Sequence, residues 1–408
     1  MTRRAPVYRW TLDPVKLKRV PVLVGELTQE SSRWEFLFDS GYLARGRDAW
    51  ELDPTVLRTK QRSAFTRTGP APFPVFCDVA LSGWSLEVVK RQAARTTLPG
   101  AEPWGWWERL LHAPADGFGA LFVGEPDARP ESLDAINAAL RNITKESLAA
   151  APLESSSGAM GGERPKVALS FELEDGSCRP SLLKFALPSE RVDSVAAEAT
   201  ALTLAQELGM RVPEHEVMWF NDAPALRIAR FDREGLEGAV WHCVSAATAL
   251  DILPSTDTED PKRNYVRLRS KLKRAEDAKE LFARIILNAV VGNTDDHPWN
   301  TSLRQLGLGE WELSPLYDVL PFYSRAGVPA FRMDLTLKHP SRVSTVENLV
   351  AAGNQIAALE RTEVIREIER STDYVRENWR RIFESHSRKG GDGAEDWAKV
   401  FEYEWREP

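Results

Sequence analysis

The sequence contains few cysteines and no long apolar run. Its only cysteines, Cys77, Cys178 and Cys243, are far apart along the 408 residues and lack the spacing of a metal site. We therefore expect no disulfide framework, and a reducing cytoplasm is the expected compartment. No apolar run approaches a membrane span, and the first ten residues, MTRRAPVYRW, lack the apolar centre of a signal peptide, so no membrane partner is expected.

An excess of positive charge is also absent. Lysine and arginine total 53 against 60 for aspartate and glutamate, which gives a net charge of −7 at pH 7. This balance argues against a nucleic-acid surface over the whole protein, so DNA contact is expected only indirectly, through a partner. The apolar fraction of 43% is ordinary for a globular protein, and the length allows two or three cores.

The most informative segment runs from residue 288 to 321, NAVVGNTDDHPWNTSLRQLGLGEWELSPLYDVLP, and contains Asp295, Asn300 and Asp318. A carboxylate that takes a hydroxyl proton, with an amide and a second carboxylate that hold magnesium, is what phosphoryl transfer from ATP requires. Protein kinases carry these groups as D-x-x-x-x-N and as the aspartate of D-F-G. Aspartate and asparagine also cap turns that have no chemistry, so the spacing alone leaves a plain turn open.

The surroundings of these residues favour chemistry. Residues 278–291, AKELFARIILNAVV, carry apolar residues at helical spacing, and Gly292 follows where a helix is expected to stop. Residues 311–313 and 316–320 have the apolar composition of short strands. We expect them to form a hairpin that folds Asp318 back toward Asp295.

A kinase also needs a lysine on the phosphates and a glutamate that holds this lysine. Residues 166–171 and 181–185 are strand-like and flank an Asp-Gly pair, which predicts a hairpin with Lys184 on its second strand. Residues 195–208 are predicted to form a helix with Glu198 on its apolar face. A carboxylate there needs a cation, and we expect Lys184 to supply it. A solvated lysine and a glutamate at the rim of the helix face are the alternative.

A run rich in serine and glycine, SSSGAMGGERPK, precedes this hairpin at residues 155–166. It lacks the G-x-x-x-x-G-K-[ST] pattern of a Walker A loop. Such a run is often a flexible linker, but its glycines also allow the backbone to approach a phosphate closely. Its place directly before the lysine hairpin favours a phosphate-binding loop.

Together these segments resemble the HipA-type serine/threonine kinases, the toxins of bacterial toxin–antitoxin modules. GNTDDHPWNTSL and LSPLYDV resemble the family's G-N-x-D-x-H-x-x-N and P-x-Y-D blocks, and GGERPKVAL, SVAAEATALTLA and IARFDR resemble its phosphate loop, glutamate helix and hinge. VGEL, FLFDSGYL and DVALSGW resemble the small subdomain before the kinase lobes. The resemblance implies an α+β protein with a two-lobed, protein-kinase-like fold, an additional N-terminal α/β subdomain and a mainly helical C-terminal lobe.

The resemblance also implies ATP and Mg²⁺ as cofactors and a role for each matching residue. Asp295 would be the catalytic base, assisted by Lys184 and Glu198, while Asn300 and Asp318 would hold magnesium. At the hinge we expect backbone contacts with adenine, and for the histidine a hydrogen bond that orders the loop. The residues implied for nucleotide binding are Gly158, Gly161, Gly162, Lys166, Lys184, Arg230, Phe231 and His297.

Many relatives are switched off by phosphorylation of a serine close before the glycine pair. In this sequence Ala159 and Met160 occupy that place. The candidates for autophosphorylation are therefore Ser155, Ser156 and Ser157, with Ser157 first.

Breaks in composition predict three domains: an N-terminal HipA-type subdomain at 1–150, a small kinase lobe at 151–236 and a helical kinase lobe at 237–408. Three tryptophans lie close together and are candidates for a partner surface: Trp104, Trp106 and Trp107. Packing in the core or at its edge is the favoured alternative.

The favoured function is a toxin kinase that transfers the γ-phosphate of ATP to a protein hydroxyl and arrests growth by inhibiting translation. The resemblance implies that a helix-turn-helix antitoxin of the HipB type neutralises it. Relatives act on aminoacyl-tRNA synthetases, and the sequence selects none in particular. A small-molecule phosphotransferase and a non-catalytic kinase-like scaffold stay open as alternatives.

Overall fold

The computed structural model describes residues 2–83, 85–87, 89–90, 104–126, 164–172, 176, 178–186, 190, 192–221, 223–235, 238–254, 257–322, 327–388 and 391–402. The chain forms two compact units. Unit 1 comprises Met1–Pro188, Met218–Val244 and Arg304–Glu310, and unit 2 comprises Ser189–Val217, Ser245–Leu303 and Trp311–Pro408. The predicted domain boundaries at residues 150 and 236 stay a prediction.

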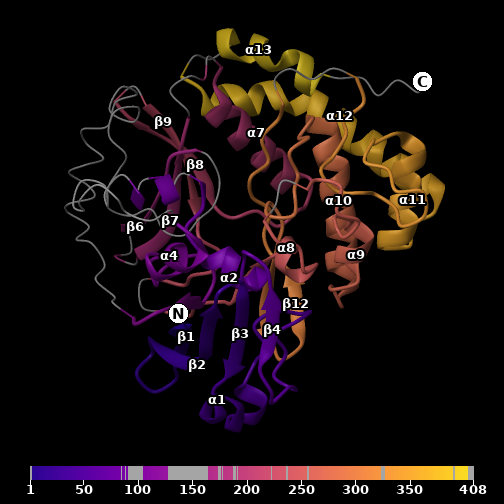
Figure 1. The fold of residues 1–408 in the computed structure, drawn as a ribbon. Helices are drawn as coiled ribbons and strands as arrows, with labels where there is room; N and C mark the ends of the chain where they lie inside the picture. The colour runs from indigo at the N-terminus through magenta and orange to yellow at the C-terminus, as the bar shows by residue number, and fades with distance from the viewer. Residues whose placement is uncertain are drawn as a thin grey trace. The chain divides into compact units, whose positions relative to one another are not determined.

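Unit 1 begins with a five-stranded antiparallel sheet in the order β4-β3-β2-β1-β5 (Figure 1). Its strands are β1 (Thr2–Asp13), β2 (Lys18–Glu30), β3 (Arg33–Phe38), β4 (Phe65–Thr68) and β5 (Leu121–Val123). The short helices α1 (Ser40–Ala44), η1 (Gly46–Asp48), α2 (Pro74–Val79) and α4 (Trp106–Leu111) belong to the same unit.

Aromatic residues build much of the core of this first sheet. Trp107 on α4 is buried and stacks on the buried Trp34 of β3, with ring centroids 6.0 Å apart. For Trp107, core packing is therefore the correct interpretation of the tryptophan cluster.

A second, four-stranded sheet has the order β6-β7-β9-β8. Its strands are β6 (Lys166–Glu172), β7 (Cys178–Phe185), β9 (Ala223–Ala229) and β8 (His215–Phe220). The antiparallel pairing of β6 with β7 confirms the predicted hairpin.

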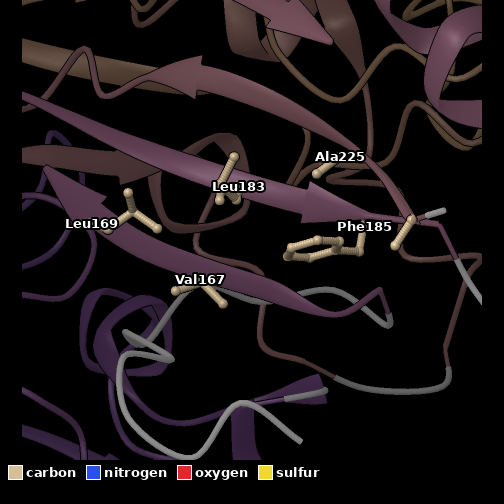
Figure 2. Close-up of a cluster of buried hydrophobic side chains, with 6 residues drawn as sticks. Val167, Leu169, Leu183, Phe185 and Ala225 are labelled. Atoms are coloured by element: carbon tan, nitrogen blue, oxygen red, sulfur yellow. The ribbon is translucent and has the colours of Figure 1, made fainter. Parts of the chain in front are cut away.

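Alternate residues of this sheet pack into one apolar cluster, because successive side chains of a strand point to opposite faces. The cluster, which Figure 2 shows on three neighbouring strands, comprises Val167, Leu169, Leu183, Phe185, Ala223 and Ala225.

Unit 2 is mainly helical. Its helices are α7 (Ser194–Glu207), α8 (Ala246–Ala249), α9 (Tyr265–Arg269), α10 (Ala275–Val291), α11 (Val346–Ala357), α12 (Arg361–His386) and α13 (Gly391–Phe401). Helix α10 packs against α11 and α12, and α12 also packs against α7 and α13 (Figure 1). A small sheet has the order β10-β11-β12, formed by Cys243–Ser245, Ser302–Gly307 and Glu310–Leu313.

Helix α7 confirms the helix predicted at 195–208, but it is not amphipathic. The Asp193 side chain accepts a hydrogen bond from the Ala196 N–H at 3.0 Å and so caps the first turn. All of its residues except Thr203, Gln206 and Glu207 are buried. Alanine, the residue with the highest helix propensity, fills much of this helix, which suits a position without room for large side chains.

Candidate active site

Helix α10 leads directly into the predicted catalytic loop. Its apolar residues at helical spacing include Leu281, Phe282 and Ile285, and all three are buried. The helix ends at Gly292, whose φ of 68° lies in the left-handed region that favours glycine. The predicted helix and its stop are therefore confirmed, and the loop starts from a fixed point.

The loop at 293–300 is held by hydrogen bonds to its own backbone. The Asp295 carbonyl accepts from the His297 N–H at 2.7 Å and from the Asn300 side-chain amide at 2.9 Å. The Asn300 N–H in turn donates to the His297 carbonyl at 2.8 Å, and the His297 ring accepts from the Trp299 N–H at 3.3 Å. The loop thus brings Asp295, His297 and Asn300 together.

The carboxylate of Asp295 is open to solvent, with 67% of the side chain exposed. Its neighbour there is Arg332, whose Nε lies 3.4 Å from Asp295 Oδ1. A second molecule can therefore reach this carboxylate.

The next residue, Asp296, points the other way and is buried. Its carboxylate accepts hydrogen bonds from the Tyr265 hydroxyl and, at 2.8 Å, from the Asn288 amide. Asn288 accepts from the Asn293 amide at 3.0 Å, and Asn293 accepts from the Asp295 N–H at 3.3 Å. Burial raises the pKa of Asp296. This chain of bonds connects α9 and α10 to the backbone of Asp295.

Asp318 lies on an irregular segment that is bonded to the same loop. The Tyr317 hydroxyl donates to the Trp299 carbonyl at 3.1 Å, and the Phe322 N–H donates to the Gly292 carbonyl at 3.0 Å. These bonds place the segment that carries Asp318 against the catalytic loop.

Residues from both parts of the site line one small cavity. Its lining includes Asp296, Asp318, Asn288 and Asn293. Its volume of about 10 Å³ is at the lower limit for one water molecule. Polar groups of the loop and of the Asp318 segment therefore meet inside unit 2.

The prediction of a strand at 316–320 is wrong. Asp318 has a φ of 58°, in the left-handed region, and the segment forms no strand. Pro315 and Pro321 flank it and have no N–H to donate to a sheet. Its apolar composition reflects the burial of Leu316 and Val319. The strand predicted at 311–313 is confirmed as part of β12, which pairs with β11, and the Ser314 N–H donates to the Ser302 carbonyl at 2.9 Å. This hairpin returns the chain toward the loop, and the hydrogen bonds above hold the segment of Asp318 there.

The predicted lysine lies on the second sheet, opposite another lysine. Lys184 of β7 pairs with Lys166 of β6, and both side chains are buried. They alternate with Val167, Leu183 and Phe185, so they point away from the apolar cluster in Figure 2. The two lysines therefore lie on the same face of the sheet.

Glu198 is buried on α7. It belongs to unit 2, whereas Lys184 belongs to unit 1, and the pairing of the two residues stays a prediction.

The side chain of Arg230 forms hydrogen bonds within unit 1. Its guanidinium donates to the two carboxylate oxygens of Asp232 at 3.0 and 2.9 Å, and to the Gly117 carbonyl at 2.6 Å. Although burial alone would raise the pKa of Asp232, the charges of Arg230 and Arg233 lower it to about 2. The Phe231 carbonyl accepts from Arg304 at 3.3 Å. Nucleotide contact by the backbone here stays a prediction.

Some predicted residues lie outside the part of the chain that the structure describes. They are the three glycines and three serines of the predicted phosphate loop: Gly158, Gly161, Gly162, Ser155, Ser156 and Ser157.

Four residues around the predicted base were not identified from the sequence: Asp296, Tyr265, Asn288 and Arg332. The adjacent pair Asp295-Asp296 was the available signal, because in a tight loop two neighbouring side chains point in different directions. Tyr265 and Arg332 are far away along the chain and carry no motif.

The helices and the cysteines both bear on the predictions from composition. Across the described residues, no helix is both long and apolar enough to cross a membrane. The three cysteines are free thiols, and Cys77 and Cys243 are buried.

Comparison with known proteins gives the family and the fold. The family described as "HipA-like C-terminal domain" matches residues 158–379. A Sinorhizobium fredii (strain NBRC 101917 / NGR234) protein named "Putative kinase Y4dM" is 31% identical over 211 residues, which cover 48% of this chain and 49% of that protein. The chain therefore spans about half the length of this relative.

A solved structure is similar over nearly the whole chain. It is a chain in the complex of the Shewanella oneidensis MR-1 toxin–antitoxin proteins HipA and HipB with their operator DNA, with a TM-score of 0.67 and 16% sequence identity. The match covers 97% of this chain and 95% of that chain. At this identity the match concerns the fold alone, and it confirms the predicted α+β, HipA-like fold.

Proposed function

Because this chain belongs to the family of the HipA-like C-terminal domain, we propose that it is an ATP-dependent serine/threonine protein kinase of the HipA type. One observation carries the proposal: the exposed carboxylate of Asp295 lies on a loop that also holds Asn300, and the Asp318 segment is bonded to this loop. The name of the Sinorhizobium relative supports a kinase.

In the proposed reaction, Asp295 acts as the general base. Its exposed carboxylate accepts the proton of a serine or threonine hydroxyl, and the oxygen attacks the γ-phosphorus of ATP. The bond between this phosphorus and the β,γ-bridging oxygen breaks, and its electron pair leaves with ADP. The hydrogen bonds that the Asp295 carbonyl accepts and its N–H donates fix the main chain that carries this carboxylate.

The residues present fit a magnesium ion. The Asn300 amide nitrogen donates a hydrogen bond to the Asp295 carbonyl, so the amide oxygen is the atom that would bind the ion. Among the described residues no group of three His, Cys, Asp or Glu side chains forms a metal site. One carboxylate and one amide oxygen suit Mg²⁺, which keeps water and phosphate oxygens as its other ligands. Asn300 and Asp318 would hold the ion, which would neutralise charge on the ATP phosphates.

The nucleotide phosphates are proposed to bind Lys166 and Lys184, which lie opposite each other on β6 and β7. Glu198 would orient Lys184, and the glycine loop before β6 would cover the phosphates. His297 would order the catalytic loop through its hydrogen bonds.

We further propose the setting of a toxin. The solved relative is HipA in complex with HipB and operator DNA. By analogy, a DNA-binding antitoxin of the HipB type would neutralise this kinase, and DNA would be contacted only through that antitoxin. Phosphorylation of an aminoacyl-tRNA synthetase would inhibit translation and arrest growth.

Incubation of the purified protein with magnesium and γ-labelled ATP tests the chemistry, with cell protein and a metabolite mixture as separate acceptors. We expect label on protein in the wild type, little with Asp295→Asn, and full activity in the matched surface variant Asp373→Asn. Label on metabolites alone would make the protein a small-molecule phosphotransferase. Failure to bind magnesium-ATP would instead favour a non-catalytic scaffold.

Autophosphorylation is proposed at the serines before the glycine pair, with Ser157 first. A phosphate adds about two negative charges beside those of ATP, so it should expel the loop from the phosphate site. Replacing Ser155, Ser156 and Ser157 with alanine should give a kinase that stays active over time. Intact-mass measurement after incubation with magnesium-ATP checks this, and a phosphate elsewhere would contradict the assignment.

A further inference from the structure

Arg332 lies on a short irregular segment whose neighbouring backbone groups are hydrogen-bonded. Its neighbours Phe331 and Met333 are buried. The Phe331 N–H donates to the Arg342 carbonyl at 2.9 Å, and the Asp334 N–H donates to the Arg263 carbonyl at 2.8 Å. The flanking side chains point inward and Arg332 points outward, with 55% of its side chain exposed.

The guanidinium of Arg332 faces the carboxylate of Asp295, with Nε 3.4 Å from Oδ1. Both side chains are more than half exposed, and exposed ion pairs contribute little to stability. Stability therefore does not account for the placement. Among the described residues, the two terminal nitrogens of Arg332 have no hydrogen-bond partner, so a planar fork of donors is available beside the predicted base.

Two other arginines near the loop have structural partners instead. Arg342 binds Glu259 at 3.0 Å and lies 3.4 Å from Asp334. Arg263 lies over the ring of Trp299, 5.5 Å from its centroid. Of these three arginines, Arg332 is the one that contacts the predicted base.

We propose that Arg332 is a catalytic residue whose guanidinium binds the γ-phosphoryl group as Asp295 takes the proton of the acceptor. This inference rests on the proposed kinase function. The acceptor O–H bond breaks, its proton goes to Asp295, the new O–P bond forms, and the bond to the β,γ-bridging oxygen breaks with its electron pair leaving on ADP. When Asp295 is protonated its charge is lost, so the charge of Arg332 is no longer balanced and stabilises the phosphoryl oxygens.

The sign of a mutational effect separates this role from mere shielding of the base. If Arg332 only covered Asp295, its removal would leave turnover unchanged or raise it. If Arg332 binds the phosphoryl group during transfer, its removal lowers kcat. ATP affinity stays unchanged because the contact forms in the transition state, and Tm stays unchanged because the ion pair is weak and exposed.

The experiment uses the full chain with two acceptors for γ-labelled ATP: water, followed as phosphate release, and casein. We expect Arg332→Gln to lower kcat on the order of 10²-fold, the usual effect of losing one transition-state donor. Arg332→Lys should recover part of this loss, since it keeps the charge but not the fork. The exposed residue Arg267 provides the control, because Arg267→Gln should match the wild type.

Two outcomes overturn the inference, and they are distinguishable. An active wild type with equal or higher kcat in Arg332→Gln refutes the role of Arg332 and leaves the kinase function intact. A folded wild type that transfers no phosphate to water, casein or cell protein refutes the proposed function, and the inference with it. Measuring Tm and the Kd for ATP on each variant excludes loss of folding as the cause of any change.

Discussion

Replacing Arg230 should destabilise unit 1 and leave nucleotide binding nearly unchanged. The guanidinium satisfies both oxygens of the buried Asp232 and the Gly117 carbonyl, so Arg230→Ala leaves a buried carboxylate with fewer donors. Removing one partner of a buried pair costs about 3–5 kcal/mol. Arg233 remains 3.1 Å from Asp232 and the Gly119 N–H still donates at 2.8 Å, so we expect the lower end of this range.

The assay is thermal and urea unfolding, followed by titration with ATP. A loss of about 3 kcal/mol in a cooperative unit of 150–250 residues lowers Tm by about 6–12 °C. Arg230→Lys should lose less, because it keeps the charge, and the exposed Arg4→Ala should stay within about 0.5 kcal/mol of the wild type. An unchanged Tm with a tenfold weaker ATP affinity would refute the reasoning and place the guanidinium at the nucleotide.

Three further predictions concern catalysis and pH. Asp295→Asn and Asp318→Asn should each lower phosphoryl transfer on the order of 10²-fold or more, and titration should show weaker magnesium-dependent ATP binding only for Asp318→Asn. Lys184→Ala and Glu198→Ala should be strongly non-additive for activity in a double-mutant cycle, and additive losses would mean that the two residues do not interact. Burial lowers the pKa of His242 from 6.5 to about 3, so as the pH falls the unfolded state takes up a proton before the folded state does. The free energy of unfolding should therefore fall below about pH 6.5, by about 2 kcal/mol at pH 5, and urea unfolding of His242→Gln should not show this loss.

The sequence predicts best where one local pattern determines the structure. Helix α10 combines helical spacing of apolar residues with a glycine at its end, and the structure has both features. The hairpin of β6 and β7 is equally local, because an Asp-Gly pair separates two strand-like runs. These two elements carry Lys184 and lead into the catalytic loop.

The rest depends on contacts between distant parts of the chain. The sequence at 316–320 has the composition of a strand, but its conformation depends on hydrogen bonds that Tyr317 and Phe322 make with Trp299 and Gly292. Burial of Asp296 requires Tyr265, which lies on another helix. Arg332 reaches Asp295 through a segment that no motif identifies. Each of these pairs forms only when the chain folds, so no local pattern in the sequence marks its members.

Helix α7 has a consequence for how this protein tolerates change. A helix buried on every side offers no surface on which residues can be exchanged neutrally. An added methylene in a well-packed core costs about 1–3 kcal/mol, a large share of a total stability of about 5–15 kcal/mol. A library that substitutes every position should therefore show a nearly continuous intolerant stretch from Ser194 to Ala205, ending at the exposed Gln206. Neutral drift is left to elements with a solvent-facing side, such as α12.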